Sequence, residues 1–306
     1  MPVEEALERL LALAEAAPIK DIERVSLAEA EGRVLATDLV ASLDLPPWPN
    51  SAMDGYALRL ADWQGEPLVV SQRIFAGHAP DALQPGTCAR IFTGAPLPAG
   101  ADCVEMQENT AVLDDGRVRF LEPLKVDQNV RPQGQETRKG EQVMCAGTRL
   151  GPIELGLAAT LGYAEVDVVR RVRVAVLSTG DELVEPGQPL GPGQIYNSNR
   201  RLLVSWLQRL GCEVRDSGIL PDDLARTREC LASLGDVDLI LSTGGVSVGE
   251  ADYLGAALRE AGELALWKLA IKPGKPLTFG HYHGVPVIGL PGNPASCLLY
   301  TSPSPR

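Results

Sequence analysis

The sequence has 306 residues, which is enough for two or three domains that each bury a hydrophobic core. Hydrophobic residues make up 45% and charged residues 22% of it, as in folded globular proteins, and the formal net charge of −12 argues against nucleic acid or an anionic membrane as partner. Six cysteines form no Cys-x-x-Cys pair, and no apolar stretch reaches membrane-spanning length. We therefore expect free or buried thiols and a cytoplasmic location.

The first half of the chain starts with a predicted helix and continues into a β-rich region. Apolar residues at helical spacing predict a helix over residues 3–16, and residues 25–41 are interpreted as a short helix leading into a strand. From residue 46 to about residue 146, short β-prone segments alternate with Gly and Pro, which indicates an inserted all-β domain. Residues 151–170 predict one further helix and one strand outside that insert.

From residue 171 onward, strands and helices alternate. The strands are apolar on both faces, which is typical of a parallel sheet covered by helices on both sides. The predicted fold class is therefore α/β plus β, with a parallel three-layer α/β/α domain at residues 171–300. Asn199 is the expected N-cap of the helix that follows the first of these strands, and Gly211 is its expected end. Ligands of such sheets bind beyond the carboxyl ends of the strands.

Small residues follow three of these strands, in the segments STG (178–180), STGG (242–245) and LPGNP (290–294). One such turn is most simply a tight connection. Small residues also let backbone N–H groups approach an anion, and the start of the following helix favours negative charge there. In the third segment, Asn293 can cap a helix that Pro294 begins. Three turns of this kind on one sheet edge predict a ligand that carries phosphate.

Carboxylates crowd the same predicted edge. They follow the strands or begin the next helices, and they are Asp181, Glu182, Asp222, Asp223, Glu250 and Asp252. Helix dipoles alone explain some acids in first turns. Phosphate and carboxylate repel each other unless a hard cation lies between them, so we interpret the cluster as a Mg²⁺ site. Zinc is not expected, because the clustered histidines at 281 and 283 are predicted to lie at a hairpin tip.

Positive charge is supplied by the segment WKLAIKPGKP (267–276) through Lys268, Lys272 and Lys275. Lysines often do no more than solvate an exposed strand. Here the strand is apolar and a Pro-Gly turn holds the chain near the sheet edge, so we interpret the three lysines as an anion-binding group.

Together these motifs resemble the molybdopterin molybdenumtransferase (molybdenum insertase) family, to which the E domain of gephyrin is related. The resemblance covers residues 1–297 approximately. The motifs that carry it are NSAMDGYA (50–57), FTGAPLP (92–98), STGDEL (178–183), GQIYNSN (193–199), STGGVSVGEADY (242–253), KLAIKPGKP (268–276) and GLPGNP (289–294).

The resemblance implies a reaction and an architecture. Adenylylated molybdopterin would bind with Mg²⁺, its pyrophosphate would be cleaved, AMP would leave, and molybdate would be inserted at the dithiolene. The active form would be a homodimer in which the β domain of one subunit closes the site of the other, with other molybdenum-cofactor biosynthesis proteins as further partners. Residues 1–45 and 147–170 would form a discontinuous helical linker domain, 46–146 the inserted β domain, and 171–300 the molybdopterin-binding domain.

The resemblance also implies site residues, motif by motif. The residues implied in catalysis are Asp54, Thr93, Glu182, Asp222 and Asp252. Those implied in holding Mg²⁺ are Glu182, Glu250 and Asp252. Those implied in binding the substrate are Ser178, Thr179, Gly180, Ser242, Gly244, Gly245, Ser247, Gly249, Lys268, Lys272, Lys275, Pro291 and Pro294.

The last residues, 301–306, depart from the family pattern, because two prolines stop the helix where the family continues into a C-terminal β domain. We interpret them as a non-family tail and expect reduced stability and poor molybdate insertion. Three alternative functions remain open. An adenylyltransferase of the same pathway would lack the long β region, and a nucleotide-cleaving enzyme of the competence-damage-inducible type would not need NSAMDGYA. A non-catalytic scaffold would not need the Asp and Lys motifs.

Overall fold

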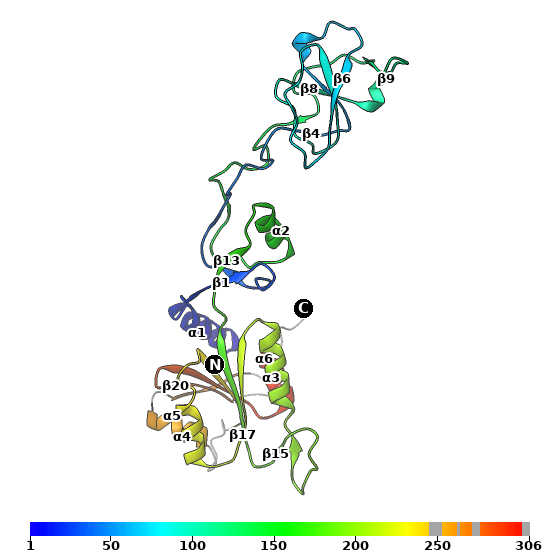
Figure 1. Cartoon of the computed structure of the whole chain (residues 1–306). Coiled ribbons are helices and arrows are strands. Elements are labelled where there is room, and N and C mark those ends of the chain that lie inside the picture. Colours follow the sequence, from blue (N-terminus) through cyan, green and yellow to red (C-terminus); the bar gives the residue numbers. More distant parts are fainter. Residues whose placement is uncertain (245–252, 262–263, 271–275, 302–306) are drawn as a thin grey trace. The chain divides into compact units, whose positions relative to one another are not determined.

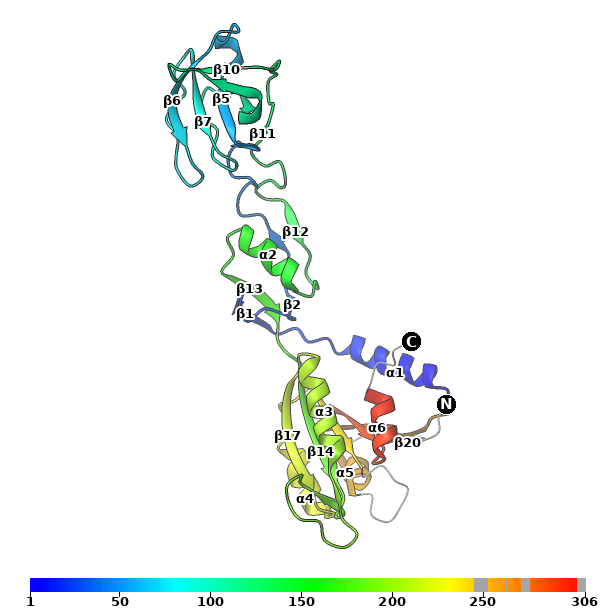
Figure 2. The ribbon, with the colours of Figure 1, turned by 90° about the vertical axis from the view of Figure 1, so that its right-hand side faces the viewer.

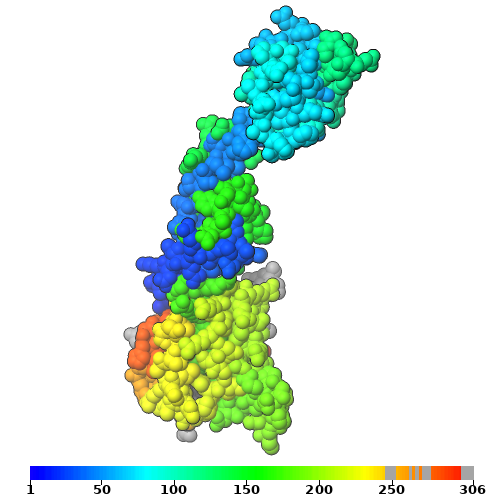
Figure 3. All heavy atoms as spheres, viewed as in Figure 1, coloured from blue at the N-terminus to red at the C-terminus, as the bar shows by residue number. Residues whose placement is uncertain are grey.

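The computed structural model divides the chain into two compact units, which we describe separately (Figure 1). The residues that the structure describes are 1–244, 253–261, 264–270 and 276–301. The α/β unit combines residues 1–23 with residues 168–306, and the β-rich unit is the continuous segment 24–167. Residues of the 168–306 segment cover most of the face of the α/β unit that is turned to the viewer in Figure 3.

The α/β unit is built on a six-stranded sheet. In sheet order the strands are β17 (Glu213–Leu220), β14 (Arg173–Thr179), β18 (Leu239–Thr243), β21 (Val285–Leu290), β20 (Pro276–Tyr282) and β19 (Leu264–Lys268). The first four are parallel, whereas β20 pairs antiparallel with β21, and β19 pairs antiparallel with β20. The expectation of an all-parallel sheet is therefore wrong at one edge.

A tight hairpin explains the antiparallel edge. Two residues, His283 and Gly284, join β20 to β21, and their φ angles are 47° and 88°. Two residues can link antiparallel neighbours, whereas a parallel link needs a crossover of a dozen residues or more. The predicted hairpin tip at the histidines is thus confirmed for His283.

Helices cover both faces of this sheet (Figure 2). They are α1 (Val3–Ala16), α3 (Ser198–Arg209), α4 (Leu224–Ala232), α5 (Tyr253–Ala261) and α6 (Pro294–Thr301). Because side chains alternate along a strand, Ala175 and Leu177 of β14 point into a core with α4 and α5, whereas Val176 points into a core with α1, α3 and α6. Among the described residues, no helix combines the length and the apolar character that a membrane crossing requires.

Two details of these helices differ from expectation. The N-cap of α3 is Asn197 and not Asn199: its side-chain oxygen accepts a hydrogen bond from the backbone N–H of Arg200. The predicted end of α3 is confirmed, since Gly211 has a φ of 89° just beyond the helix. Helix α1 packs through Ala6 into the core of the α/β unit, whereas residues 1–45 were expected to form part of a linker domain.

The β-rich unit contains a four-stranded sheet in the order β6-β7-β5-β8. These strands are β6 (Val69–Ile74), β7 (Thr87–Ile91), β5 (Gly55–Leu58) and β8 (Cys103–Met106). The unit also contains two separate antiparallel strand pairs. In one, β4 (Asn50–Ser51) pairs with β11 (Val130–Arg131), and in the other, β9 (Thr110–Val112) pairs with β10 (Val118–Phe120). One of its two apolar clusters contains the thiols of both Cys88 and Cys103, and burial raises the pKa of each to about 12. All six cysteines of the chain are free, so they form no disulfide.

The remainder of the β-rich unit contains one helix, α2 (Pro152–Thr160), as expected. A three-stranded sheet in the order β1-β13-β2 joins β1 (Ile22–Ser26), β13 (Glu165–Val169) and β2 (Val34–Leu35), and β12 (Gln142–Met144) pairs with β3 (Leu39–Val40). The short helix predicted within residues 25–41 is wrong, because that segment forms turns and short strands.

A charged contact fixes the start of the α/β sheet. Arg170 donates to both carboxylate oxygens of Asp238, at 2.6 and 2.8 Å, and the backbone N–H of Arg173 donates to Asp238 at 2.8 Å. Arg170 also donates to Asp21 at 2.7 Å. The Asp238 side chain is 19% exposed. The guanidinium of Arg170 is the main cause that lowers the pKa of Asp238, and burial opposes it.

We expect Asp238→Asn to lower the free energy of unfolding of the α/β unit by about 2 kcal/mol at pH 7, because hydrogen bonds to a charged group are each worth about 1.5–3 kcal/mol. Since the folded pKa lies below the unfolded value of about 3.9, this stabilisation is present above pH 4 and is lost as the pH falls through the folded pKa. Urea unfolding at pH 7 and pH 3 measures both effects.

The matched control is Asp236→Asn, because Asp236 contacts Arg215 at 3.1 Å but is 70% exposed. An exposed ion pair contributes at most about 1 kcal/mol. Equal losses in the two variants, or an undiminished Asp238→Asn effect at pH 3, would contradict the prediction.

Candidate functional site

A pocket of about 270 Å³ lies at the carboxyl ends of β14 and β18, where helices α3 and α6 begin. The residues that line it are Thr179, Glu182, Leu183, Ile195, Tyr196, Asn197, Ser198, Asn199, Thr243, Gly244, Gly292, Asn293 and Pro294. Leu183, Ile195 and Tyr196 supply apolar surface, while amides and hydroxyls supply most of the polar surface. The position agrees with the rule that ligands of open α/β sheets bind beyond the carboxyl strand ends.

The two strand ends are held together by hydroxyl groups and by one glycine. The hydroxyls of Ser178 and Thr243 are both buried and lie 2.7 Å apart. Gly244 has a φ of 87°, and a Cβ there would lie 2.6 Å from the backbone oxygen of Thr179. Only glycine permits this approach, because a backbone atom cannot move aside as a flexible side chain can. The small residues of the strand-end turns are thus required by packing of β14 against β18.

The two helix starts are organised by asparagines. The side-chain oxygen of Asn197 caps α3, and that of Asn293 accepts from the N–H groups of Ala295 at 3.0 Å and Ser296 at 3.2 Å. The expected roles of Asn293 as cap and Pro294 as first helical residue are therefore confirmed. Asn199 donates to the backbone oxygen of Gly292 at 2.7 Å and so ties one helix start to the turn before the other.

Glu182 is the one carboxylate among the described lining residues of this pocket. Its carboxylate lies over Gly180, where a Cβ would come within 2.2 Å of an Oε atom, so Gly180 makes room for it. The neighbouring acids are engaged elsewhere: Asp181 accepts from the N–H of Asp222 at 3.1 Å, and Asp223 caps α4 through the N–H of Arg226 at 2.8 Å. Glu182 therefore remains as the carboxylate that faces the pocket.

The pocket fits a hard cation in part. A Mg²⁺ ion takes oxygen ligands and is commonly held by one or two carboxylates together with substrate phosphates. Within the described part of the chain, no three His, Cys, Asp or Glu side chains gather into a metal cluster. Glu182 could supply one ligand, and the other two acids predicted to hold Mg²⁺, Glu250 and Asp252, lie outside the described residues.

The β-rich unit places Asp54 and Thr93 together. One carboxylate oxygen of Asp54 accepts hydrogen bonds from both the hydroxyl and the backbone N–H of Thr93, each at 2.7 Å. These two bonds, followed by the nearby Arg90, lower the pKa of Asp54. Arg90 also donates to the backbone oxygen of Gly55 at 2.8 Å, which steadies the turn that carries Asp54. The result is an ionised carboxylate in a fixed orientation.

The other predicted residues are found in several places. Ser178 and Ser242 are buried at the strand ends below the pocket, and Pro291 is buried in the turn before α6. Asp222 is half-buried outside the lining, and Lys268 is the last residue of edge strand β19. The predicted residues that lie outside the described part of the chain are Gly245, Ser247, Gly249, Glu250, Asp252, Lys272 and Lys275.

Several lining residues were not predicted as site residues. The polar ones are Asn197, Ser198, Asn199, Thr243, Gly292 and Asn293. Three of them fall in the segment GQIYNSN, whose two asparagines just before a predicted helix are the available signal. The segment predicts a helix cap, at Asn199 instead of Asn197, and it is one of the motifs that carry the family resemblance, but its residues were not among the predicted site residues.

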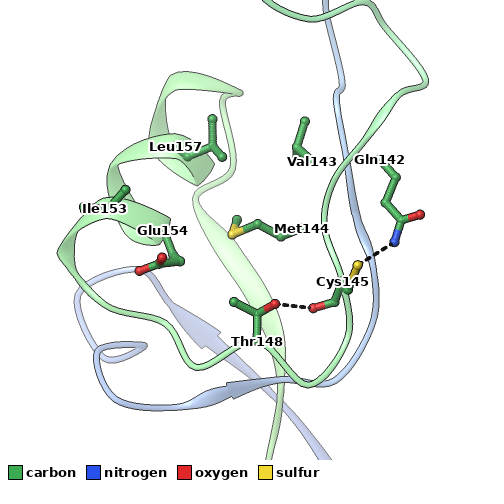
Figure 4. A pocket seen from close by; sticks show the side chains of 8 residues that line it. All are labelled: Gln142, Val143, Met144, Cys145, Thr148, Ile153, Glu154 and Leu157. Carbon is green, nitrogen blue, oxygen red and sulfur yellow. Dashed lines mark hydrogen bonds between the residues drawn. The ribbon is translucent and has the colours of Figure 1, made fainter.

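A second pocket, of about 500 Å³, lies in the β-rich unit beside α2 (Figure 4). Met144, Ile153 and Leu157 contribute apolar side chains to it, and Gln142 donates a hydrogen bond to the sulfur of Cys145 at 3.3 Å. Its one carboxylate, Glu154, already accepts from the backbone N–H of Gly151 at 3.0 Å as part of the α2 cap. Because no predicted site residue lies there, we assign the functional site to the pocket of the α/β unit.

Comparison with known proteins identifies the family. Residues 1–162 match the family model described as MoeA N-terminal region (domain I and II), and residues 175–302 match the probable molybdopterin binding domain. The molybdopterin molybdenumtransferase of Haemophilus influenzae is 46% identical over 280 residues, which cover 90% of this chain and 69% of the relative. That of Synechococcus elongatus is 42% identical over 310 residues, which cover 96% and 76%. This chain belongs to the molybdopterin molybdenumtransferase family.

Solved structures agree with this family fold. A crystal structure of the MoeA molybdopterin biosynthesis protein of Pyrococcus horikoshii superposes with a TM-score of 0.82 at 35% identity, covering 97% of this chain and 76% of that chain. The resemblance inferred from the motifs is therefore confirmed. The match of residues 1–162 to the N-terminal region of the molybdopterin molybdenumtransferase family also disfavours the adenylyltransferase and nucleotide-cleaving alternatives, which would not need that region.

Proposed function

We propose that this chain acts in molybdenum cofactor biosynthesis as a molybdopterin molybdenumtransferase, which inserts molybdate into adenylylated molybdopterin and releases AMP. The observation that carries the proposal is the polar pocket at the ends of β14 and β18, in a chain whose family is defined by this transferase. Two helix starts, backbone N–H groups and hydroxyls line that pocket, and such groups bind phosphate oxygens. The apolar side chains in its lining suit the heterocycle of the substrate.

The proposal gives the described residues separate tasks. Glu182 would hold Mg²⁺ together with pyrophosphate oxygens, and the cation would neutralise charge that develops on the leaving AMP. Thr179, Gly244 and the start of α6 would surround the phosphate end. Asp54, oriented by Thr93, would act from the β-rich unit. Cleavage of the pyrophosphate bond consumes one water molecule and gives AMP and molybdopterin, whose dithiolene then binds molybdate.

The assembly and the finer fold assignment are part of the same proposal. We propose a homodimer, as the family resemblance implies. The proposed domains are a three-layer α/β/α domain that binds molybdopterin, a linker region, and an inserted β domain at residues 46–146. Sedimentation analysis of the purified chain tests the dimer.

The test of the activity is direct. The purified chain is incubated with adenylylated molybdopterin, Mg²⁺ and molybdate, and released AMP is measured against reactions that lack molybdate or contain a chelator. The proposal predicts AMP release that depends on Mg²⁺, and formation of the molybdenum-loaded product that depends on molybdate as well. A folded chain that releases no more AMP than the protein-free control would overturn it.

A further inference from the structure

Asn197 carries a buried donor with no partner. The residue is 2% exposed, yet its side-chain nitrogen has no hydrogen-bond partner among the residues that the structure describes. Buried polar groups are nearly always paired in folded proteins, so an unpaired one needs an explanation. Asn197 is one of the residues that line the pocket at the end of β14, so a ligand that enters the pocket and displaces the atoms covering this nitrogen would be its partner.

Hydrogen bonds fix the direction in which the Asn197 amide points. Its oxygen accepts from the backbone N–H of Arg200 at 3.2 Å and from the hydroxyl of Ser178 at 3.5 Å. Reversing the amide would place its NH₂ group against the N–H of Arg200, so two donors would face each other. The cap therefore leaves the NH₂ group as the free end of the side chain.

The surroundings of this NH₂ group favour an oxyanion. Asn197 caps α3, a helix of 12 residues, and the first N–H groups of a helix have no partner within the helix. The helix dipole adds partial positive charge at the same point. Glu182 in the same pocket opposes an anion by itself, and a divalent cation between the two removes the conflict.

We propose that Asn197 binds the substrate directly by donating a hydrogen bond from its carboxamide to a phosphate oxygen. This assignment rests on the proposed function, since it names a further residue that contacts the same phosphate-bearing substrate. Among the described residues that line the pocket there is no lysine or arginine, so this amide would supply a donor to phosphate there. An amide binds the oxyanion without adding a charge that would compete with the cation beside Glu182.

Three variants test the assignment by calorimetric titration with AMP and with pyrophosphate, each in the presence of Mg²⁺. Asn197→Asp keeps the capping oxygen and replaces the donor with a second oxygen. It should weaken binding of both probes at least about 10-fold, because one hydrogen bond to a charged group is worth at least that much. Asn197→Ser keeps a capping hydroxyl and adds no charge, and it should weaken binding about 5-fold. Gln208→Glu adds the same charge on the exposed side of α3 and should stay within about twofold of the parent.

The outcomes separate this assignment from the proposed function. If the parent binds both probes and the two Asn197 variants bind them as tightly, the assignment is overturned while the function stands. If the folded parent binds neither probe, the proposed function fails and the assignment fails with it. Melting temperatures within a few degrees of the parent show that the cap is intact, and should Asn197→Asp fold poorly, Asn197→Ser alone decides.

Discussion

The substitution Gly55→Ala is expected to destabilise the β-rich unit by at least about 3 kcal/mol, above the usual 1–3 kcal/mol range for an overpacked core. Gly55 begins β5, which lies between β7 and β8, and a Cβ there would lie 1.8 Å from the backbone oxygen of Glu105. In a typical core, side chains yield to an added methyl group. Here the clashing atom belongs to a paired strand, so the sheet itself must separate.

The destabilisation should also disturb Asp54, one of the predicted catalytic residues. Asp54 precedes Gly55 directly, and its backbone oxygen accepts from the N–H of Gln107 at 3.0 Å. When β5 moves away from β8, this bond and the orientation of Asp54 toward Thr93 are lost together. We therefore expect the melting temperature of the unit to fall by about 10 °C and AMP release to fall with it.

The same exchange at Gly156 provides the control. Gly156 lies inside helix α2 of the same unit, and a Cβ there meets no atom within 4 Å. Alanine is preferred over glycine in a helix by about 1 kcal/mol, so Gly156→Ala should be neutral or stabilising. A Gly55→Ala protein that melts with the parent would show that β5 and β8 do not approach as closely as described.

The second large effect is expected from Glu182→Gln, which should lower Mg²⁺-dependent AMP release about 100-fold, equivalent to about 2.7 kcal/mol of transition-state stabilisation. Glutamine keeps the shape of the side chain over Gly180 and removes the charge from the one carboxylate in the described lining. Folding should therefore be unaffected, and the defect should be smaller at high Mg²⁺ concentration. Initial rates across a Mg²⁺ titration measure both effects.

Glu229→Gln is the matched control for the charge. Glu229 lies on helix α4, is exposed, and pairs with Arg226 at 3.8 Å, so the exchange should change neither rate nor stability measurably. An unchanged rate for Glu182→Gln at limiting Mg²⁺ would remove Glu182 from the cation site. That result would leave the family assignment intact, because the assignment rests on other parts of the chain.

Local patterns predicted most elements of the α/β unit, because each strand is apolar and each helix has a clear period. These local patterns failed where a contact with a residue far away in the sequence decides which residue caps a helix, or whether a segment forms a helix or a strand. Asn197 and Asn199 can each cap a helix, and the choice depends on the bond from Asn199 to Gly292, which lies far away in the sequence. Residues 25–41 contain Ala, Leu and Glu, which favour helices, but Gly32 donates to Leu150 at 2.7 Å with a φ of 73° and the segment pairs as strands instead.

The site was predictable to a similar extent. Because the carboxyl ends of parallel strands meet at one edge, the turns after β14 and β18 were expected to lie together, and they share one pocket. The donors from the asparagines were not expected, since amides give weaker sequence signals than lysines or acids. Asp54 and Thr93 were found through the family resemblance alone, because they are 39 positions apart in the sequence and only the fold of the β-rich unit brings them into contact.

The order in which the chain is connected has a consequence for its synthesis on the ribosome. Residues 24–167 are continuous and can fold as soon as they emerge, whereas α1 must wait for the sheet that starts after residue 168. Domains generally fold as units during translation. The pairing of β1 with β13 brings the two ends of the β-rich unit side by side. Most of the entropy lost in closing this long loop is therefore lost before the six-stranded sheet of the α/β unit is synthesised. The nascent helix α1, whose Ala6 packs into the core of the α/β unit in the finished fold, therefore lacks that packing partner until the later strands have been synthesised.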